Sequence, residues 1–357
     1  MIMKTKKFVV NPFIRVRLDA PNNSRDMSVI LQNAITKKEF SIDDGIFDLL
    51  MYCSKSRKKT EILSHFSNSL SDNHDNILDM LINEEILVTQ DKISLYKLWD
   101  ERGWRNALYY HLFTKDNQFA DMGNDNDYQV KANILENYSK YQPLKEFFKE
   151  MKNGIKLPRP KVQFSSAGKI IFNRRTSRNF SGQPITLQQL SIILHYACQP
   201  AKMVREYAEK NSKTNPLLLT LSLYTPFEIY FSATGLKNLP DGIYHYNMRK
   251  HQINNIRKGR FNSKMRKIAI GQGVDGCSVV FIITSRFGRY MWRYRNSRAL
   301  RNLYIECASF AHRFILCATA LELKTFITPA IRDSIADKLL KIDGFEEAAT
   351  YLVAVGN

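Results

Sequence analysis

The sequence predicts an α+β fold in which a small domain that begins with strands precedes a larger domain of mixed strands and long helices. Near the N-terminus, apolar residues alternate over 8–18 and 29–40, as they do in half-buried paired strands. In the second half, the apolar run 277–285 is typical of a buried strand, and an apolar stripe over 297–323 predicts a long packed helix. Strands and long helices that cover one another form an α+β architecture.

Length and charge limit the possible functions. The chain has 357 residues, which suits two domains. Its hydrophobic content of 44% is sufficient for a sizeable core. Because the chain has 53 basic and 34 acidic side chains, its net charge is +19 and we expect an anionic partner. Nucleic acid, an acidic peptide, a phosphorylated cofactor and a membrane surface all qualify, and net charge alone does not choose among them.

Cysteine spacing and the N-terminal residues indicate whether a metal site is present and which cellular compartment the protein occupies. The five Cys form no CxxC pair and no Cys/His pair with zinc-finger spacing, so no metal site is predicted. Core thiols in a reducing cytoplasm are the simplest account of them. No apolar stretch follows the basic N-terminus, and no apolar run reaches the length of a membrane span. We therefore expect a cytoplasmic protein without a membrane partner.

The small domain is expected over residues 1–96. Strands come first, three short helices follow, and a small wing closes the domain, which predicts a winged-helix-like shape. Asp43 or Asp44 can cap the first helix. In order, the expected elements are a strand over 8–18, a hairpin over 29–40, a helix from the cap to Cys53, helices over 60–66 and 77–83, and a possible strand over 93–96.

A bridge is expected over residues 97–160. Trp99 and Trp104 precede an aromatic-rich helix over 108–114, and we expect His111 to pack within this aromatic cluster. The segment ends in two prolines at 158 and 160, which predict an extended entry into the next domain.

The second domain is expected over residues 161–357. Its first long helix has a capping box, because Thr186 can act as N-cap and Gln189 stands three residues later. The apolar residues that follow have helical spacing and should face the core: Leu187, Leu190, Ile193, Leu194 and Ala197. Further expected elements are strands near 225–232, 242–246, 251–253, 277–285 and 351–356, the helix over 297–323, and a short helix that ends near 344.

The stretch Arg174-Arg175-Thr176-Ser177-Arg178 concentrates three guanidinium groups and two hydroxyls in five positions. Cationic forks and hydroxyl donors are what a doubly charged phosphomonoester requires. The alternative is a solvated basic turn without a ligand. The order of residue types, with Phe180 next and a Pro-Ile-Thr step into a helix, resembles the opening motif of the FMN-dependent nitroreductase superfamily. That resemblance implies that Arg174, Arg175, Thr176, Ser177 and Arg178 hold the phosphate and ribityl chain of FMN.

Four segments of the second domain resemble the SagB-like azoline dehydrogenases, which mature thiazole/oxazole-modified peptides. They are Arg174–Phe180, Pro226–Tyr230 with Gly242–Tyr246, the Arg-rich stretch before the 297–323 helix, and Leu339–Gly344 with the final strand. The resemblance implies a homodimer that binds FMN, a two-electron redox step on a ribosomally made precursor peptide, and a partner cyclodehydratase or other modification enzyme. The small domain resembles PqqD-like recognition domains, which bind a leader peptide as an added strand.

The same resemblance supplies the remaining site residues. Anchored on Glu306, Arg298 and Arg301 match two family arginines. The family's pair that handles the proton then corresponds to Tyr294-Arg295, or to Arg293-Tyr294 with a one-residue slip. The family's flavin loop corresponds to 219–225, with Ser222, and Ala330 offers an N–H near flavin N5. The predicted site is Tyr294 and Arg293 for catalysis, and Arg174, Arg175, Thr176, Ser177, Arg178, Ser222, Arg298, Arg301 and Ala330 for FMN.

Departures from the family pattern leave a second hypothesis open. The family's Lys is replaced near Tyr294, where arginine cannot act as a base. Two glycines of the flavin loop are missing, and Pro329 has no N–H. The chain is therefore either an FMN oxidoreductase, for azoline dehydrogenation or a related peptide step, or a flavin-free scaffold that binds peptide. Nucleic acid is not the expected partner, because Asp79, Glu84 and Glu85 make the third helix region acidic.

Overall fold

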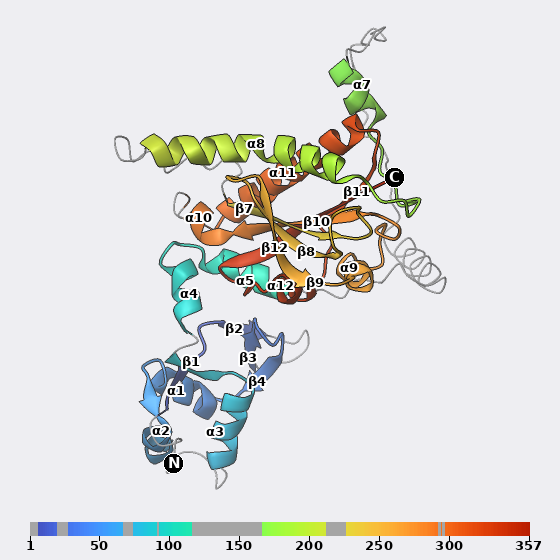
Figure 1. Cartoon of the computed structure of the whole chain (residues 1–357). Coiled ribbons are helices and arrows are strands. Elements are labelled where there is room, and N and C mark those ends of the chain that lie inside the picture. The colour runs from blue at the N-terminus through green and yellow to red at the C-terminus, as the bar shows by residue number, and fades with distance from the viewer. Residues whose placement is uncertain are drawn as a thin grey trace, which may run out of the picture. The chain divides into compact units, whose positions relative to one another are not determined.

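The computed structural model describes residues 6–19, 28–66, 74–90, 93–115, 166–211, 226–291, 294 and 297–357 (Figure 1). The chain forms two compact units. The first comprises residues 1–115 with 291–300, and the second comprises 116–290 with 301–357. Of the expected bridge over 97–160, the part after residue 115 lies outside the described residues.

The described strands of the first unit form two three-stranded antiparallel sheets, with the strand orders β5-β1-β6 and β2-β3-β4. The core of this unit lies between the strands and the first three helices and includes Leu31, Leu49, Ile62 and Leu81. The strands are β1 (Lys7–Val10), β2 (Ile14–Asp19), β3 (Ser28–Asn33), β4 (Glu39–Ile42), β5 (Arg57–Lys58) and β6 (Leu87–Thr89).

The single strand expected over 8–18 is wrong, because β1 and β2 belong to different sheets. The chain turns between them at Asn11 and Pro12. The Asn11 side chain accepts a hydrogen bond from the Phe13 N–H at 3.0 Å and donates one to the Glu85 carbonyl at 2.7 Å. Pro12 has no N–H to give to a ladder. A buried asparagine turn therefore separates two short strands that alternation alone joins.

The first unit's helices are α1 (Asp44–Tyr52), α2 (Lys59–Phe66), α3 (His74–Asn83), α4 (Ile93–Asp100) and α5 (Arg105–Thr114). The Asp43 carboxylate caps α1 by accepting from the Ile46 N–H at 2.8 Å, one of the two predicted caps. The strand expected over 93–96 is wrong, since α4 occupies it. Trp99, fully buried on α4, packs on Trp104 and stacks on His111, so aromatic packing outweighs local strand propensity.

A six-stranded antiparallel sheet forms the centre of the second unit, in the order β11-β12-β10-β7-β8-β9. Its inner strands are almost entirely buried, as the apolar run over 277–285 predicts. The strands are β7 (Phe227–Ala233), β8 (Gly242–Asn247), β9 (Gln252–Lys258), β10 (Val279–Arg286), β11 (Lys324–Thr328) and β12 (Glu347–Gly356).

Helices cover both faces of this sheet, with α8 and α11 on one side and α9 and α12 on the other (Figure 1). Phe310 and Phe314 of α11 pack on Phe227 and Phe281 of the sheet. The helices are α7 (Ser166–Asn173), α8 (Leu187–Asn211), α9 (Asn262–Ile268), α10 (Phe287–Met291), α11 (Ala299–Ala320) and α12 (Asp333–Leu340). The mixed architecture confirms the predicted α+β class.

The start of α8 confirms the predicted capping box. The Thr186 N–H donates to Gln189 Oε1 at 2.9 Å, and the Gln189 N–H donates to Thr186 Oγ1 at 3.1 Å. Leu190, Ile193 and Leu194 are buried as their spacing predicts, whereas Leu187 is 38% exposed. The cap and the apolar stripe therefore fix where this helix begins and which side faces the sheet.

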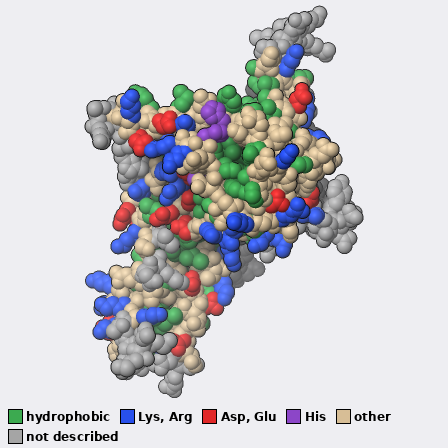
Figure 2. Space-filling model, in the orientation of Figure 1, with side chains coloured by type: hydrophobic (Ala, Val, Ile, Leu, Met, Phe, Trp, Pro, Cys, Tyr) green, Lys and Arg blue, Asp and Glu red, His purple; other side chains and the backbone are tan. Residues whose placement is uncertain are grey.

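On the face shown in Figure 2, Lys and Arg side chains are scattered over both units and interspersed with Asp and Glu. The large positive net charge is thus not gathered into one stripe on this face. No described helix combines the length and the apolar character that crossing a membrane requires.

Candidate functional site

The arginine-rich loop, residues 174–178, leaves the end of α7 and runs beside β11. Thr176 forms a parallel bridge with Thr325, and the Ser177 N–H donates to the Thr325 carbonyl at 2.8 Å. The guanidinium of Arg178 lies over the Phe326 ring, 5.2 Å from its centroid. The backbone of the loop is therefore held against the edge of the sheet while its polar side chains remain largely at the surface.

Close packing just after the loop anchors it further. Phe180 packs on the core that α9 and α12 cover. A Cβ on Gly276 would lie 2.8 Å from the Phe180 carbonyl oxygen, and one on Gly356 would lie 2.9 Å from the Phe180 ring. Both positions therefore require glycine. The Ser181 N–H also donates to the carbonyl of Asn357 at 2.7 Å, which joins the loop to the last residue of the chain.

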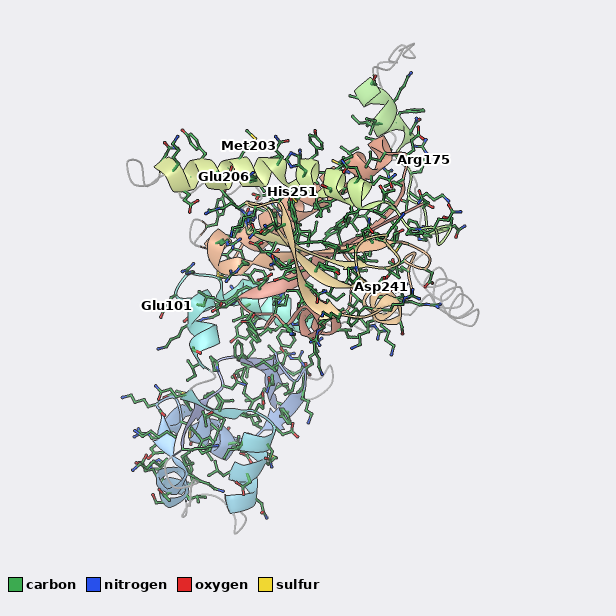
Figure 3. The ribbon with its side chains drawn as sticks, viewed as in Figure 1. Glu101, Arg175, Met203, Glu206, Asp241 and His251 are labelled. Carbon is green, nitrogen blue, oxygen red and sulfur yellow. The ribbon has the colours of Figure 1, made fainter. Side chains whose placement is uncertain are left out.

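The three guanidinium groups of the loop have different surroundings. Arg175, labelled in Figure 3, donates to the carbonyls of Phe172 at 2.6 Å and Arg174 at 2.9 Å, so it caps the end of α7. Within the described ranges, no carboxylate forms an ion pair with Arg174, Arg175 or Arg178. A basic loop that no carboxylate among the described residues neutralises fits a phosphate group, which supplies the opposite charge.

Ala330 lies two residues beyond the far end of β11, so the loop and Ala330 belong to opposite ends of one strand. Its N–H donates to Thr328 Oγ1 at 3.0 Å. The N–H predicted to approach a flavin is thus held in a local turn that fixes its direction. A cofactor atom would share this donor with the threonine hydroxyl.

The other predicted site residues are less closely grouped. Arg298 and Arg301 are exposed at the start of α11, and Glu306, which follows them on the helix, accepts a hydrogen bond from the Tyr290 hydroxyl at 2.8 Å. Tyr294 is half-buried in the first unit, where its carbonyl accepts from Trp104 Nε1. Ser222 and Arg293 lie outside the described residues.

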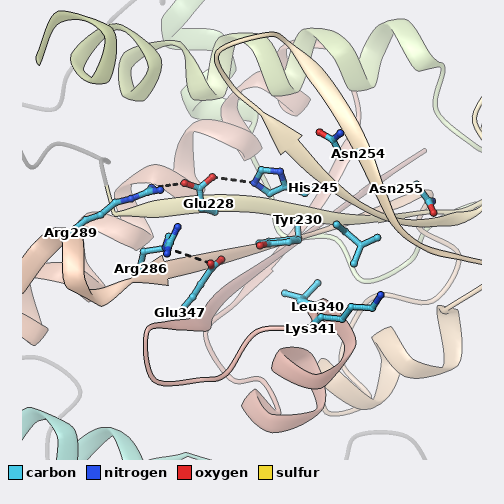
Figure 4. A pocket seen from close by; sticks show the side chains of 11 residues that line it. Glu228, Tyr230, His245, Asn254, Asn255, Arg286, Arg289, Leu340, Lys341 and Glu347 are labelled. Atoms are coloured by element: carbon cyan, nitrogen blue, oxygen red, sulfur yellow. Dashed lines mark hydrogen bonds and ion pairs between the residues drawn. The ribbon is translucent and has the colours of Figure 1, made fainter. Parts of the chain in front are cut away.

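A polar pocket of about 610 Å³ opens in the second unit, away from the predicted residues (Figure 4). Its lining residues come from five strands, β7, β8, β9, β10 and β12, from α10, and from the end of α12. The residues that line it are Glu228, Tyr230, His245, Asn254, Asn255, Ile256, Arg286, Arg289, Leu340, Lys341 and Glu347.

Glu228 of β7 is the centre of a charge network in this pocket. Its side chain is only 12% exposed, and it meets His245 Nε2 at 3.2 Å and Arg289 (Figure 4). It also meets Arg205 of α8 at 3.3 Å. Burial alone would raise the pKa of this carboxyl. The hydrogen bond from His245 and the charges of Arg205 and Arg289 outweigh burial and lower the pKa to about 2. Glu228 is therefore a fixed anion whose partners hold it in place.

A second carboxylate, Glu347 at the start of β12, accepts a hydrogen bond from the Thr284 hydroxyl and lies 3.8 Å from Arg286 Nε. Beside it, burial and the negative charge of Glu347 raise the pKa of Tyr230, so this phenol stays protonated. The sequence offers one signal for these groups, because Glu228 is a lone acid within an otherwise apolar strand. Its partners are too distant in the chain to be identified from the sequence.

Known proteins resemble this chain over the second unit and, in one case, over almost its whole length. Residues 171–357 match the Nitroreductase family. The chain is 26% identical to the trifolitoxin operon protein TfxC of Rhizobium leguminosarum bv. trifolii, over 94% of this chain and 97% of that protein. It is 28% identical to the trifolitoxin-processing protein TfxB of the same organism, over 46% of this chain and 45% of that one. Among solved structures, a chain of the Escherichia coli microcin synthetase McbBCD complex with truncated pro-MccB17 bound has a TM-score of 0.47 and 16% identity, over 74% of this chain and 96% of that one.

Proposed function

This chain belongs to the nitroreductase family, and on that basis we propose that it is an FMN-dependent oxidoreductase that modifies a ribosomally synthesised precursor peptide. The observation that carries the proposal is the loop over 174–178, which the sheet edge holds and which no described carboxylate neutralises. The family assignment agrees with the resemblance that the loop's residue order indicates.

The residues present fit the phosphate end of FMN. Arg174 and Arg178 neutralise the phosphate, the hydroxyls of Thr176 and Ser177 donate to it, and the glycine at 273 leaves space for the Arg178 side chain. Bound FMN supplies two-electron transfer. In this proposal the Ala330 N–H, which donates to Thr328 Oγ1 beyond the other end of β11, is also a donor to the ring system.

The remaining predicted residues have supporting roles in this proposal. The Tyr294 hydroxyl donates or accepts the proton that accompanies electron transfer, with Arg293 beside it in the chain. Arg298 and Arg301 add positive charge at the start of α11, and Ser222 contributes a hydroxyl to the cofactor. The proposed reaction is a two-electron change on an azoline or on another residue of the peptide, and assays must cover both directions of the reaction.

The peptide substrate is supported by two observations. The relative that matches almost the whole chain is encoded in the trifolitoxin operon, and a second relative is named as trifolitoxin-processing. In the first unit, β2 is at the edge of its described sheet and exposes Val16 at 54% and Leu18 at 61%. A leader peptide can extend such an edge as an added strand while its apolar side chains cover these two residues.

A homodimer completes the proposed assembly, together with a partner modification enzyme such as a cyclodehydratase. The outer side of α8 exposes Tyr196, Met203 and Tyr207, each more than half accessible and spaced seven and four residues apart. Figure 3 shows Met203 directed away from the sheet. An apolar stripe of this kind on a surface helix is typical of an interface with another protein.

The first test is the visible absorption spectrum of the purified full-length protein, before and after denaturation. We expect flavin bands near one FMN per chain, with free FMN released on unfolding. Arg174→Gln and Arg178→Gln should each weaken FMN binding by about tenfold, because each removes a charge-assisted contact to phosphate. Arg175→Gln should have a smaller effect, since Arg175 already donates to the carbonyls of Phe172 and Arg174.

Arg249→Gln is the matched control, because it removes one exposed arginine that pairs with Glu209 far along the chain from the loop. Equal loss of FMN in this variant and in Arg174→Gln would show that net charge, rather than the loop, governs binding. A colourless protein that takes up no added FMN would exclude the oxidoreductase and leave the alternative, a flavin-free nitroreductase-fold scaffold that binds peptide.

A further inference from the structure

The polar pocket of the second unit contains two carboxylates that are already engaged. Oε1 of Glu228 contacts the guanidinium groups of Arg205 and Arg289, and Oε2 contacts the imidazole of His245. Glu347 accepts a hydrogen bond from Thr284 and lies near Arg286. A carboxylate has room for about four donors, so three partners use most of the capacity of Glu228. The Glu347 side chain is only 13% exposed and has Arg286 as its nearby cation. Both acids are therefore already paired with cations of the protein.

The pocket has more cationic hydrogen-bond donors than its two carboxylates need for charge pairing. Three cationic side chains line it, against two carboxylates. The Arg286 side chain is 44% exposed, and its contact with Glu347 is long, at 3.8 Å, so this pair leaves most of the hydrogen-bonding capacity of its five N–H groups unused. The exposed amide of Asn254 on β9 adds donors at the same opening, whereas the Asn255 amide already donates to the Arg257 carbonyl at 3.3 Å. The excess of donors favours an anionic ligand.

Lys341 is held at this opening by an unusual backbone conformation. It is the C-cap of α12 with φ 62° and ψ 40°, the left-handed region where glycine is preferred. Its ammonium group forms no ion pair with a described carboxylate. A lysine costs stability relative to glycine at such a position. Retaining a charged side chain there is understandable if the ammonium group binds something.

We propose that this pocket binds carboxylate groups, with Arg286 on one side of it and Lys341 on the other as its principal donors and the amide of Asn254 as a further donor (Figure 4). Arg289 stays with Glu228 and shapes the wall of the site. The volume of about 610 Å³ is within the usual range for small-ligand sites and admits either a free dicarboxylic acid or the acidic side chain of a peptide. The inference does not depend on FMN.

The test is isothermal titration calorimetry on the full-length protein at fixed ionic strength, with glutarate as the probe. We expect a dissociation constant on the order of 1 mM, since two charge-assisted contacts act at an open site. Glutaramide, which has the same shape without charge, should not bind. Arg286→Gln and Lys341→Gln should each raise the dissociation constant by about tenfold.

Two further variants separate binding from folding. Lys341→Gly should bind as weakly as Lys341→Gln while unfolding at the same or a higher temperature, because glycine suits the left-handed backbone. Lys338→Gln removes one exposed cation from the same helix outside the pocket and should bind glutarate as the wild type does. Equal affinities in Lys341→Gln, Lys338→Gln and the wild type would overturn the proposal.

Additional ligands identify the source of the carboxylate. If it is a peptide side chain, the blocked tripeptide acetyl-Gly-Glu-Gly-amide binds at least as tightly as glutarate. If it is a free small acid, glutarate binds more tightly than the tripeptide. Inorganic phosphate that binds tenfold more tightly than both would contradict the carboxylate assignment, and so would glutaramide that binds as well as glutarate.

Discussion

At the scale of single residues, Glu228 makes the stability of this protein depend on pH. Its pKa of about 2 in the folded chain is below its ordinary value of 4.5, which corresponds to about 3 kcal/mol of folding free energy. Because the folded pKa is lowered, this contribution is complete above about pH 5 and is lost as pH falls toward 2. By pH 3, about 2 kcal/mol should be gone.

Urea unfolding of the wild type and Glu228→Gln at pH 6, 4 and 3 measures this contribution. The difference in unfolding free energy between the two proteins should shrink by about 2 kcal/mol from pH 6 to pH 3. Glu206→Gln, at an exposed carboxylate of α8, serves as the control and should follow the wild type. A difference that stays constant with pH would mean that Glu228 does not titrate as its partners require.

Gly273 provides a second prediction for a single residue. A Cβ there would lie 2.8 Å from Arg178 Cγ and 3.1 Å from the Phe326 ring, so Gly273→Ala should displace the arginine from its place beside β11. Overpacking of this kind costs about 1–3 kcal/mol. We expect weaker FMN binding by about tenfold, measured by fluorescence titration. Gly288→Ala, where an added Cβ meets nothing within 4 Å, should leave FMN binding unchanged.

The residue scale also shows what a sequence can and cannot indicate. The loop over 174–178 is predictable because its charges and hydroxyls are adjacent in the chain. The Glu228 network is not, since Arg205, His245 and Arg289 come from α8, β8 and α10 and meet only in the folded sheet. The left-handed backbone conformation of Lys341 is equally unpredictable from the sequence, because lysine has no preference for that conformation.

At the scale of elements, the α8 capping box has a measurable contribution. Thr186→Ala removes the hydroxyl that accepts from the Gln189 N–H, and should lower the unfolding free energy by about 1 kcal/mol. Thr186→Ser keeps the oxygen and should cost much less. Urea unfolding followed by circular dichroism distinguishes the two. Equal losses for Ala and Ser would indicate that the threonine methyl group, rather than the cap, is responsible.

Elements were predictable where local chemistry and packing agree. Asp43 and Thr186 mark helix starts by their side chains, and the apolar run over 277–285 marks a central strand. Prediction failed where distant contacts decide the conformation. Asn11 splits one alternating stretch into β1 and β2 by bonding to residues near 85, and the aromatic cluster around Trp99 makes 93–100 helical.

At the scale of the whole molecule, the least predictable feature is the grouping of residues 291–300 with the first unit. Two contacts within that unit account for it. Trp104 Nε1 donates to the Tyr294 carbonyl, and the Ala107 N–H donates to Ser297 Oγ at 3.2 Å. Both join residues 190 positions apart. The proposed proton-transfer residue thus has its backbone fixed by α5 and the residue before it, an arrangement that no local pattern of the sequence indicates.

The last prediction concerns assembly. If the exposed side of α8 joins two copies of the chain, Met203→Glu places a charge at the centre of the stripe that Tyr196 and Tyr207 continue. Burying an unpaired carboxylate against apolar side chains should raise the dimer dissociation constant on the order of 100-fold. Sedimentation velocity should then show a dimer for the wild type and a monomer for the variant. Gln252→Glu, at an exposed position of β9, adds the same charge elsewhere and should remain dimeric. A wild-type protein that sediments as a monomer would contradict the homodimer directly.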